Sequence, residues 1–115
     1  MNSESRYVKI VLTTPESYAD VIKNAMAKAG AGKIGNYSHC FFTVKGIGQF
    51  KPEAGAKPFI GEINKVESVT EERIETVCER QYLNAVIEAI KKVHPYDEIA
   101  LDIYPLEEVG MNIKK

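Results

Sequence analysis

Apolar and polar residues alternate with a period of two along four segments of the chain, and this pattern predicts four β-strands. The expected strands cover residues 7–13, 36–45, 65–78 and 99–104. The alternation of the third segment slips near residues 71–73, which predicts a β-bulge at that point.

Two further segments carry apolar residues at helical spacing. The first helix is expected to begin at Pro15, with Thr14 as its N-cap, and to end at Gly30. The second is expected over residues 80–93, where Pro95 prevents its continuation.

The resulting order, β-α-β-β-α-β, predicts an α+β ferredoxin-like sandwich over a single domain, residues 1–115. Right-handed crossovers then place both helices on one face of a four-stranded antiparallel sheet. The first and third strands are expected in the centre, and the second and fourth at the edges.

The side chains of the expected sheet divide into a helix-facing set and an open set. The helix-facing set comprises Val8, Ile10, Leu12, Cys40, Phe42, Val44, Ile99, Leu101 and Ile103. The open set comprises Tyr7, Val11, Tyr37, His39, Phe41, Thr43 and Tyr104. An open face this aromatic favours an interface between identical subunits. The alternative is a solvated amphipathic sheet with scattered aromatic residues.

Between the second and third strands lies a glycine- and proline-rich segment, Gly46–Glu62, which we call the arm. Its sequence, GIGQFKPEAGAKPFIGE, has neither helical nor strand periodicity. Connections this long in a small domain are usually functional or disordered. Phe50, Phe59 and Ile60 argue against disorder, because they need a surface to pack on.

Composition narrows the class of protein. Of the 115 residues, 44% are hydrophobic and 27% charged, as in an ordinary globular domain, and the formal net charge is −1. This balance disfavours nucleic acid as a partner. The sequence shows neither a signal peptide nor an apolar run long enough to span a membrane, so a cytoplasmic location with two reduced cysteines is expected.

Residues 30–35, GAGKIG, match the pattern G-x-G-x-x-G. A dinucleotide site needs this pattern after a strand and before a helix, whereas here it follows a helix. Helix capping and a tight turn are the preferred interpretation, and anion binding by the loop amides is the alternative.

Four motifs together resemble a known family. They are G-x-G-x-F-x-P at residues 46–52, G-A-x-P-x-I-G-E at 55–62, ESVTEERIE at 67–75 and HPYDE at 94–98. The chain resembles the CutA-like, PII-like module inserted in bacterial YqfO-type proteins, over about residues 7–106. The family commonly has two glutamates where Asp97 and Glu98 stand here, which preserves both charges.

The resemblance implies the ferredoxin-like fold and trimeric packing through the open sheet face. It also implies that the di-metal site of the two-domain relatives belongs to their flanking domain. We therefore expect a non-enzymatic homotrimeric module that binds a small ligand or a protein partner at subunit clefts. The candidate ligand-binding residues are Gly46, Gly48, Phe50, Pro52, Gly61, Glu62, His94, Tyr96 and Glu98.

Two alternatives remain from the sequence. A metal-binding protein would use imidazole and thiolate ligands for a divalent metal, drawn from His39, Cys40, Cys78 and His94, which are expected at one end of the sheet. An enzyme would use His94 and Glu98 as acid and base at a subunit junction.

Overall fold

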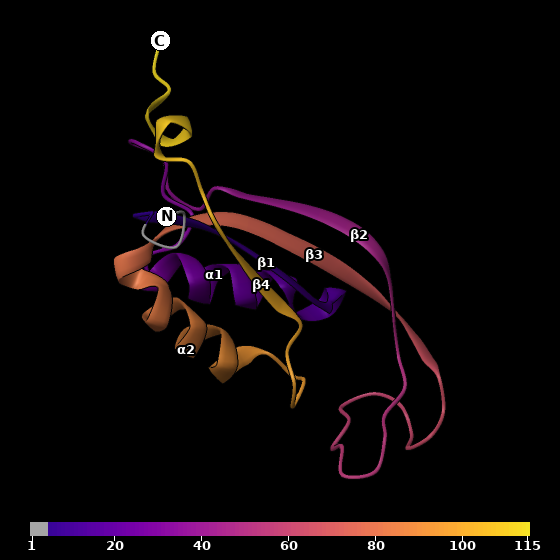
Figure 1. Ribbon diagram of the computed structural model, residues 1–115. Helices are drawn as coiled ribbons and strands as arrows, with labels where there is room; N and C mark the ends of the chain where they lie inside the picture. Colours follow the sequence, from indigo (N-terminus) through magenta and orange to yellow (C-terminus); the bar gives the residue numbers. More distant parts are fainter. Residues whose placement is uncertain (1–4) are drawn as a thin grey trace.

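The computed structural model describes residues 5–115 and has the predicted order of strands and helices (Figure 1). The four strands are β1 (Tyr7–Pro15), β2 (Phe41–Phe50), β3 (Glu67–Glu79) and β4 (Leu101–Pro105). The two helices are α1 (Ala19–Ala29) and α2 (Leu83–Val93), each preceded by a single 3-10 turn.

All neighbouring strands are antiparallel, and their order across the sheet is β2-β3-β1-β4. The predicted positions of the central strands β1 and β3 and of the edge strands β2 and β4 are confirmed. Both helices lie on the same face of the sheet, which completes the two-layer ferredoxin-like sandwich (Figure 1).

The core lies between the sheet and the two helices. Its buried side chains are Val8, Ile10, Leu12, Ala19, Ile22, Met26, Ala31, Ile74, Cys78, Val86 and Ile90. Burial of this apolar set supplies the main favourable term for folding. Among residues 5–115, no helix has the length and apolar character needed to cross a membrane.

The predicted face of β2 is wrong by one residue. Phe41 packs against the core, whereas Phe42 and Val44 are 66% and 42% exposed. Phe41 pairs with Thr76, which is 4% exposed, so Phe41 and Thr43 belong to the helix side. Two adjacent phenylalanines satisfy either alternation, and β2 begins five residues later than predicted. Phe42 and Val44 therefore join the open face.

The other edge of the sheet also departs from the prediction. Ile99 and Leu101 pack against the core as expected, but Ile103 is 37% exposed because β4 is an edge strand. Tyr37 and His39 precede β2 and are exposed, and His39 has a positive φ of 58°. Neither belongs to the sheet.

Two local predictions are corrected as well. β1 continues through Pro15, and α1 begins only at Ala19 without a side-chain cap. β3 keeps one continuous register with β2 from Thr76 to Glu67, so the predicted bulge at residues 71–73 is wrong. The pattern slips there because Glu71 is buried by Gly48 of β2 and by Tyr96, which lies outside the sheet, as described below.

The loop at residues 30–35 uses its amides within the fold. The N–H groups of Gly30, Ala31, Gly32 and Ile34 all donate to backbone carbonyls. Gly30 ends α1 with a φ of 122°, and a Cβ there would lie 2.8 Å from Cγ of Tyr82. These contacts support the capping interpretation rather than anion binding.

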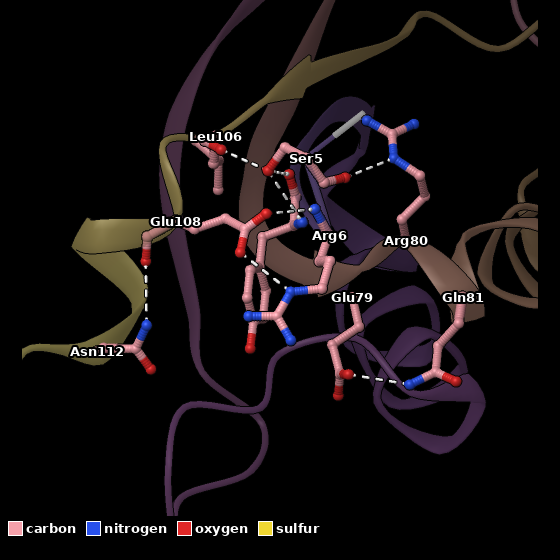
Figure 2. Close-up of polar contacts among 9 residues, drawn as sticks. Ser5, Arg6, Glu79, Arg80, Gln81, Leu106, Glu108 and Asn112 are labelled. Carbon is pink, nitrogen blue, oxygen red and sulfur yellow. Dashed lines mark hydrogen bonds and ion pairs between the residues drawn. The ribbon is translucent and has the colours of Figure 1, made fainter. Parts of the chain in front are cut away.

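The start of the described chain contacts the segment that follows β4 (Figure 2). The hydroxyl of Ser5 donates to the carbonyl oxygen of Leu106, and Nε of Arg80 donates to the carbonyl oxygen of Ser5 over 2.7 Å. Arg6 forms an ion pair with Glu108, with Nε 3.0 Å from Oε1. The start of β1 is thereby joined to the segment that follows β4.

Candidate functional site

Strands β2 and β3 extend beyond the end of β1 and carry the arm at their tip (Figure 1). Gly46–Phe50 of the arm belongs to β2, and the rest forms the loop to β3. From the sequence, the whole of this segment was expected to be irregular, because its glycines obscure the strand pattern. The strand continues because the backbone of residues 46–50 pairs with residues 67–71.

The arm loop folds back toward the body of the domain. The amide of Lys57 donates to Oδ2 of Asp97 over 3.0 Å, and Phe59 stacks edge-on against Tyr18 with ring centroids 5.6 Å apart. Within the loop, the amide of Asn64 donates to the carbonyl oxygen of Pro52, which is buried. The expectation that the arm's aromatic residues find a packing surface is met in part for Phe59, which makes this contact but remains 51% exposed.

This fold-back forms a half-open cavity of about 770 Å³, which we call the arm cavity. One wall comes from the arm, another from the α2–β4 connection, and the ends of β1 and β3 supply Thr13 and Glu71. Cavities of this size hold small organic ligands. The arm cavity therefore has the dimensions of a ligand site within one chain.

The lining combines acidic and aromatic side chains. Its ionisable side chains are Lys51, Glu53, Glu71, Tyr96, Asp97 and Glu98. Phe50, Phe59 and Tyr96 contribute aromatic surface, and the rings of Phe50 and Tyr96 meet edge-on at 5.8 Å.

Glu71 lines the cavity and is 7% exposed. Its Oε2 accepts a hydrogen bond of 2.8 Å from the hydroxyl of Tyr96. Its Oε1 lies against Gly48, where a Cβ would overlap it. Gly48 thus leaves room for the close approach of a carboxylate.

His94 holds the α2–β4 connection in place behind the cavity. Its Nε2 lies 2.8 Å from the carbonyl oxygen of Thr13, and its Nδ1 accepts a hydrogen bond from the amide of Tyr96. The second bond requires an unprotonated Nδ1, so the ring is neutral with its proton on Nε2. Tyr96 is thereby positioned to reach Glu71.

Burial shifts the pKa values of both rings. Desolvation lowers the pKa of His94, against the opposing influence of the Thr13 carbonyl and the Glu71 charge. Desolvation, the hydrogen bond to Glu71 and the charge of Glu71 all raise the pKa of Tyr96. Tyr96 therefore stays protonated and donates to the carboxylate at neutral pH.

Several predicted ligand-binding residues come together here. The arm cavity is lined by Gly48, Phe50, Pro52, Tyr96 and Glu98. Gly46 lines a smaller adjoining hollow of about 200 Å³, which shares Thr13, Gly48 and Glu71 with the arm cavity.

The remaining predicted ligand-binding residues lie outside the lining. Gly61, with a φ of 99°, packs near Glu67, and Glu62 forms an exposed ion pair with Lys65. His94 is buried behind the cavity wall. The sequence missed Glu71 as a cavity residue, although the break in alternation at this position was the available signal.

The predicted meeting of the metal candidates at one end of the sheet is wrong. Cys78 pairs with Val8 near the start of β1, whereas His94 contacts Thr13 near its end. The error arose because antiparallel pairing places the end of β3 beside the start of β1. His39 and Cys40 precede β2 near Thr76, at the Cys78 end. Across residues 5–115, no group of three or more His, Cys, Asp and Glu side chains is arranged to hold a metal ion.

Comparison with known proteins reveals clear relatives by sequence. The chain is 51% identical over 100 residues to the GTP cyclohydrolase 1 type 2 homolog of Bacillus subtilis (strain 168), covering 87% of this chain and 27% of that protein. It is 47% identical over 108 residues to the protein of the same name from Halalkalibacterium halodurans, covering 94% and 29%. No family model matches the chain. The chain thus spans less than a third of the length of these curated relatives.

Solved structures agree with this placement. The Bacillus cereus protein related to NIF3 superposes with a TM-score of 0.78 at 40% identity, over 90% of this chain and 26% of that one. CutA from Xylella fastidiosa superposes with a TM-score of 0.64 at 16% identity, over 90% and 86%, a likeness of fold. The chain is therefore homologous to one segment of the GTP cyclohydrolase 1 type 2 homologs and NIF3-related proteins, and that segment has a CutA-like ferredoxin fold.

Proposed function

We propose that this chain is a homo-oligomeric binding module of the CutA-like, PII-like type found in YqfO-type proteins, and that it binds a small ligand in the arm cavity. The cavity of about 770 Å³ carries the proposal, because it is formed by residues of the family-like motifs. The arm supplies one wall, and the HPYDE motif supplies Tyr96, Asp97 and Glu98.

The open sheet face supports self-association. Phe42 and Tyr104 are 66% and 52% exposed on it, together with Val44. The edge strand β2 runs for ten residues with one side unpaired within the described chain. Apolar faces and long free edges of this kind are usually covered by another chain. A trimer is the arrangement suggested by the CutA-like fold.

A binding role suits the side chains of the cavity better than an acid–base role does. Both ring nitrogens of His94 are already engaged, by Thr13 and by the amide of Tyr96. A general base must be able to reach the proton that it removes. Within the longer relatives, we assign this segment to ligand sensing or assembly. Catalysis named for the whole protein would then belong to the rest of the relative.

Native mass spectrometry of untagged protein tests the proposal. We expect a trimer that carries additional mass, retained on gentle desolvation and lost in Tyr96→Ala. Tyr37→Ala serves as a matched control, because Tyr37 is 75% exposed and does not line the cavity. A monomer would contradict the oligomeric part. A bound mass that survives Tyr96→Ala unchanged would place the ligand elsewhere.

A further inference from the structure

The charge of the arm cavity is strongly one-sided. Four carboxylate residues line it, namely Glu53, Glu71, Asp97 and Glu98, against one basic residue, Lys51. Asp97 already accepts the hydrogen bond from the arm amide of Lys57. The lining therefore disfavours a phosphate or carboxylate ligand and favours a positive charge.

Glu71 differs from the other carboxylates because its side chain is 7% exposed and only one of its two oxygens has a hydrogen-bond donor. Its Oε2 is bonded to Tyr96, a neutral donor. Among residues 5–115, no donor hydrogen-bonds to Oε1, and none of the ion pairs involves Glu71. In the described part of the chain, no buried side-chain oxygen or nitrogen lacks a hydrogen-bond partner, so Oε1, which has none, is the oxygen of Glu71 that remains open to solvent and to a ligand. The unfilled oxygen belongs to a residue that lines the cavity.

Aromatic surface stands beside this carboxylate. The ring of Tyr96 is hydrogen-bonded to it, and the ring of Phe50 packs against Tyr96. Aromatic faces attract ammonium and guanidinium groups, and the attraction strengthens where water is excluded. A carboxylate flanked by rings recognises an organic cation by charge, hydrogen bonding and stacking together.

We propose that the arm cavity binds a small organic cation, whose ammonium or guanidinium group donates to Oε1 of Glu71 beside the rings of Phe50 and Tyr96. This inference rests on the proposed function, of which it names the ligand class. Gly48 is the residue that leaves room for Oε1, and Tyr96 fixes Oε2 so that Oε1 is left for the ligand.

Three probes with chains of equal length distinguish binding by charge from binding by apolar contact alone. They are hexylammonium, 1-hexanol and hexanoate. Each is titrated into the 115-residue protein while the amide signals of Gly48, Glu71 and Tyr96 are followed by NMR. We expect hexylammonium to bind at least about tenfold more tightly than 1-hexanol, since a charge-assisted hydrogen bond is about twice as strong as a neutral one. Hexanoate should bind most weakly.

Glu71→Gln preserves the shape of the side chain and removes its charge. We expect the tenfold preference for hexylammonium to fall to about threefold or less, because only screened carboxylates remain. Glu53→Gln, at an exposed position of the same lining, should keep the preference. Should Glu71→Gln not fold, Glu71→Ala replaces it, and the preference for hexylammonium should fall in the same way.

The outcomes distinguish this inference from the proposed function. Equal binding of hexylammonium and 1-hexanol, or a preference that survives Glu71→Gln, would overturn the cation assignment and leave the cavity as a ligand site. The same holds if hexanoate binds best. If none of the probes moves the cavity signals, the inference is wrong, and the bound-mass experiment decides the proposed function independently.

Discussion

Nε2 of His94 lies 2.8 Å from the carbonyl oxygen of Thr13, so the end of α2 is fastened to the end of β1 by a neutral imidazole. The same ring accepts the amide of Tyr96 on Nδ1. One side chain therefore fixes the connection that carries the HPYDE motif. Two of the predictions below concern this wall of the cavity and its neighbour Glu71.

The neutral state of His94 predicts a pH-dependent stability. Burial lowers the pKa of folded His94 below its ordinary value of 6.5, so the unfolded chain binds the proton more readily. The contribution is fully present above about pH 6.5 and is lost as pH falls toward the folded-state pKa. Thermal unfolding at pH 5.5 and 7.5 should show lower stability at pH 5.5.

Substitution identifies the group responsible. His94→Gln should lower the free energy of unfolding by about 1–3 kcal/mol at pH 7.5, because the Thr13 carbonyl and the Tyr96 amide lose their hydrogen bonds to the imidazole. The same variant should flatten the pH dependence of stability between pH 5.5 and 7.5. His39→Gln removes the other histidine, which is exposed, and should leave both stability and slope unchanged. An unchanged slope in His94→Gln would assign the pH dependence to other groups.

Gly48→Ala should be destabilising, although Gly48 lies in a strand. The added Cβ would overlap Oε1 of Glu71, so the carboxylate would have to shift, which disturbs its hydrogen bond with Tyr96. We expect a loss of about 1–3 kcal/mol in the free energy of unfolding by urea, as for overpacked sites. Gly46→Ala, two residues earlier in β2, meets nothing within 4 Å and should change stability by about 0.5 kcal/mol or less.

The two cysteines should differ sharply in reactivity. Burial, with a smaller contribution from Glu79, raises the pKa of Cys78 to about 11, whereas Cys40 is partly exposed. At pH 8 only about one Cys78 thiol in a thousand is ionised, and the thiolate is the reactive form. Iodoacetamide followed by peptide mass analysis should modify Cys40 rapidly and Cys78 at least about tenfold more slowly. Cys40→Ser should abolish the fast phase, and fast labelling of Cys78 would show that the core opens.

The open face should govern self-association. Phe42→Asp places a charge at the most exposed aromatic position of that face and should convert the oligomer to monomer in sedimentation velocity. Val21→Asp introduces the same charge at a 46% exposed position of α1 and should leave the oligomer intact. Dissociation by both variants would indicate general destabilisation, and dissociation by neither would move the interface elsewhere.

The fold could be predicted from the sequence because, in most segments, the spacing of apolar residues agrees with the positions of the glycines and prolines that end each element. Ile10 and Leu12 in β1, and Val86 and Ile90 in α2, lie on the buried faces that their spacing indicates. The face of β2 could not be obtained this way, because Phe41 and Phe42 are both apolar. Only the pairing of Phe41 with Thr76 decides which of them enters the core.

The candidate site was predicted in part, for a different reason. Phe50, Pro52 and Tyr96 belong to recognisable motifs and do line the cavity. Glu71 looked like one of several exposed strand glutamates, because its burial depends on Tyr96 and Gly48, which are 25 and 23 positions away in the chain. Contacts over such separations leave no periodic trace in a single sequence.

The hydrogen bond between Ser5 and Leu106 has an architectural consequence. The polypeptide enters the sheet and leaves it at neighbouring points, which is the geometry that tolerates circular permutation and insertion into a host loop. A larger protein could contain this fold as a domain inserted between two adjacent points of its own surface. The arm, at the far end of the β2–β3 hairpin, would then project away from the point of attachment (Figure 1).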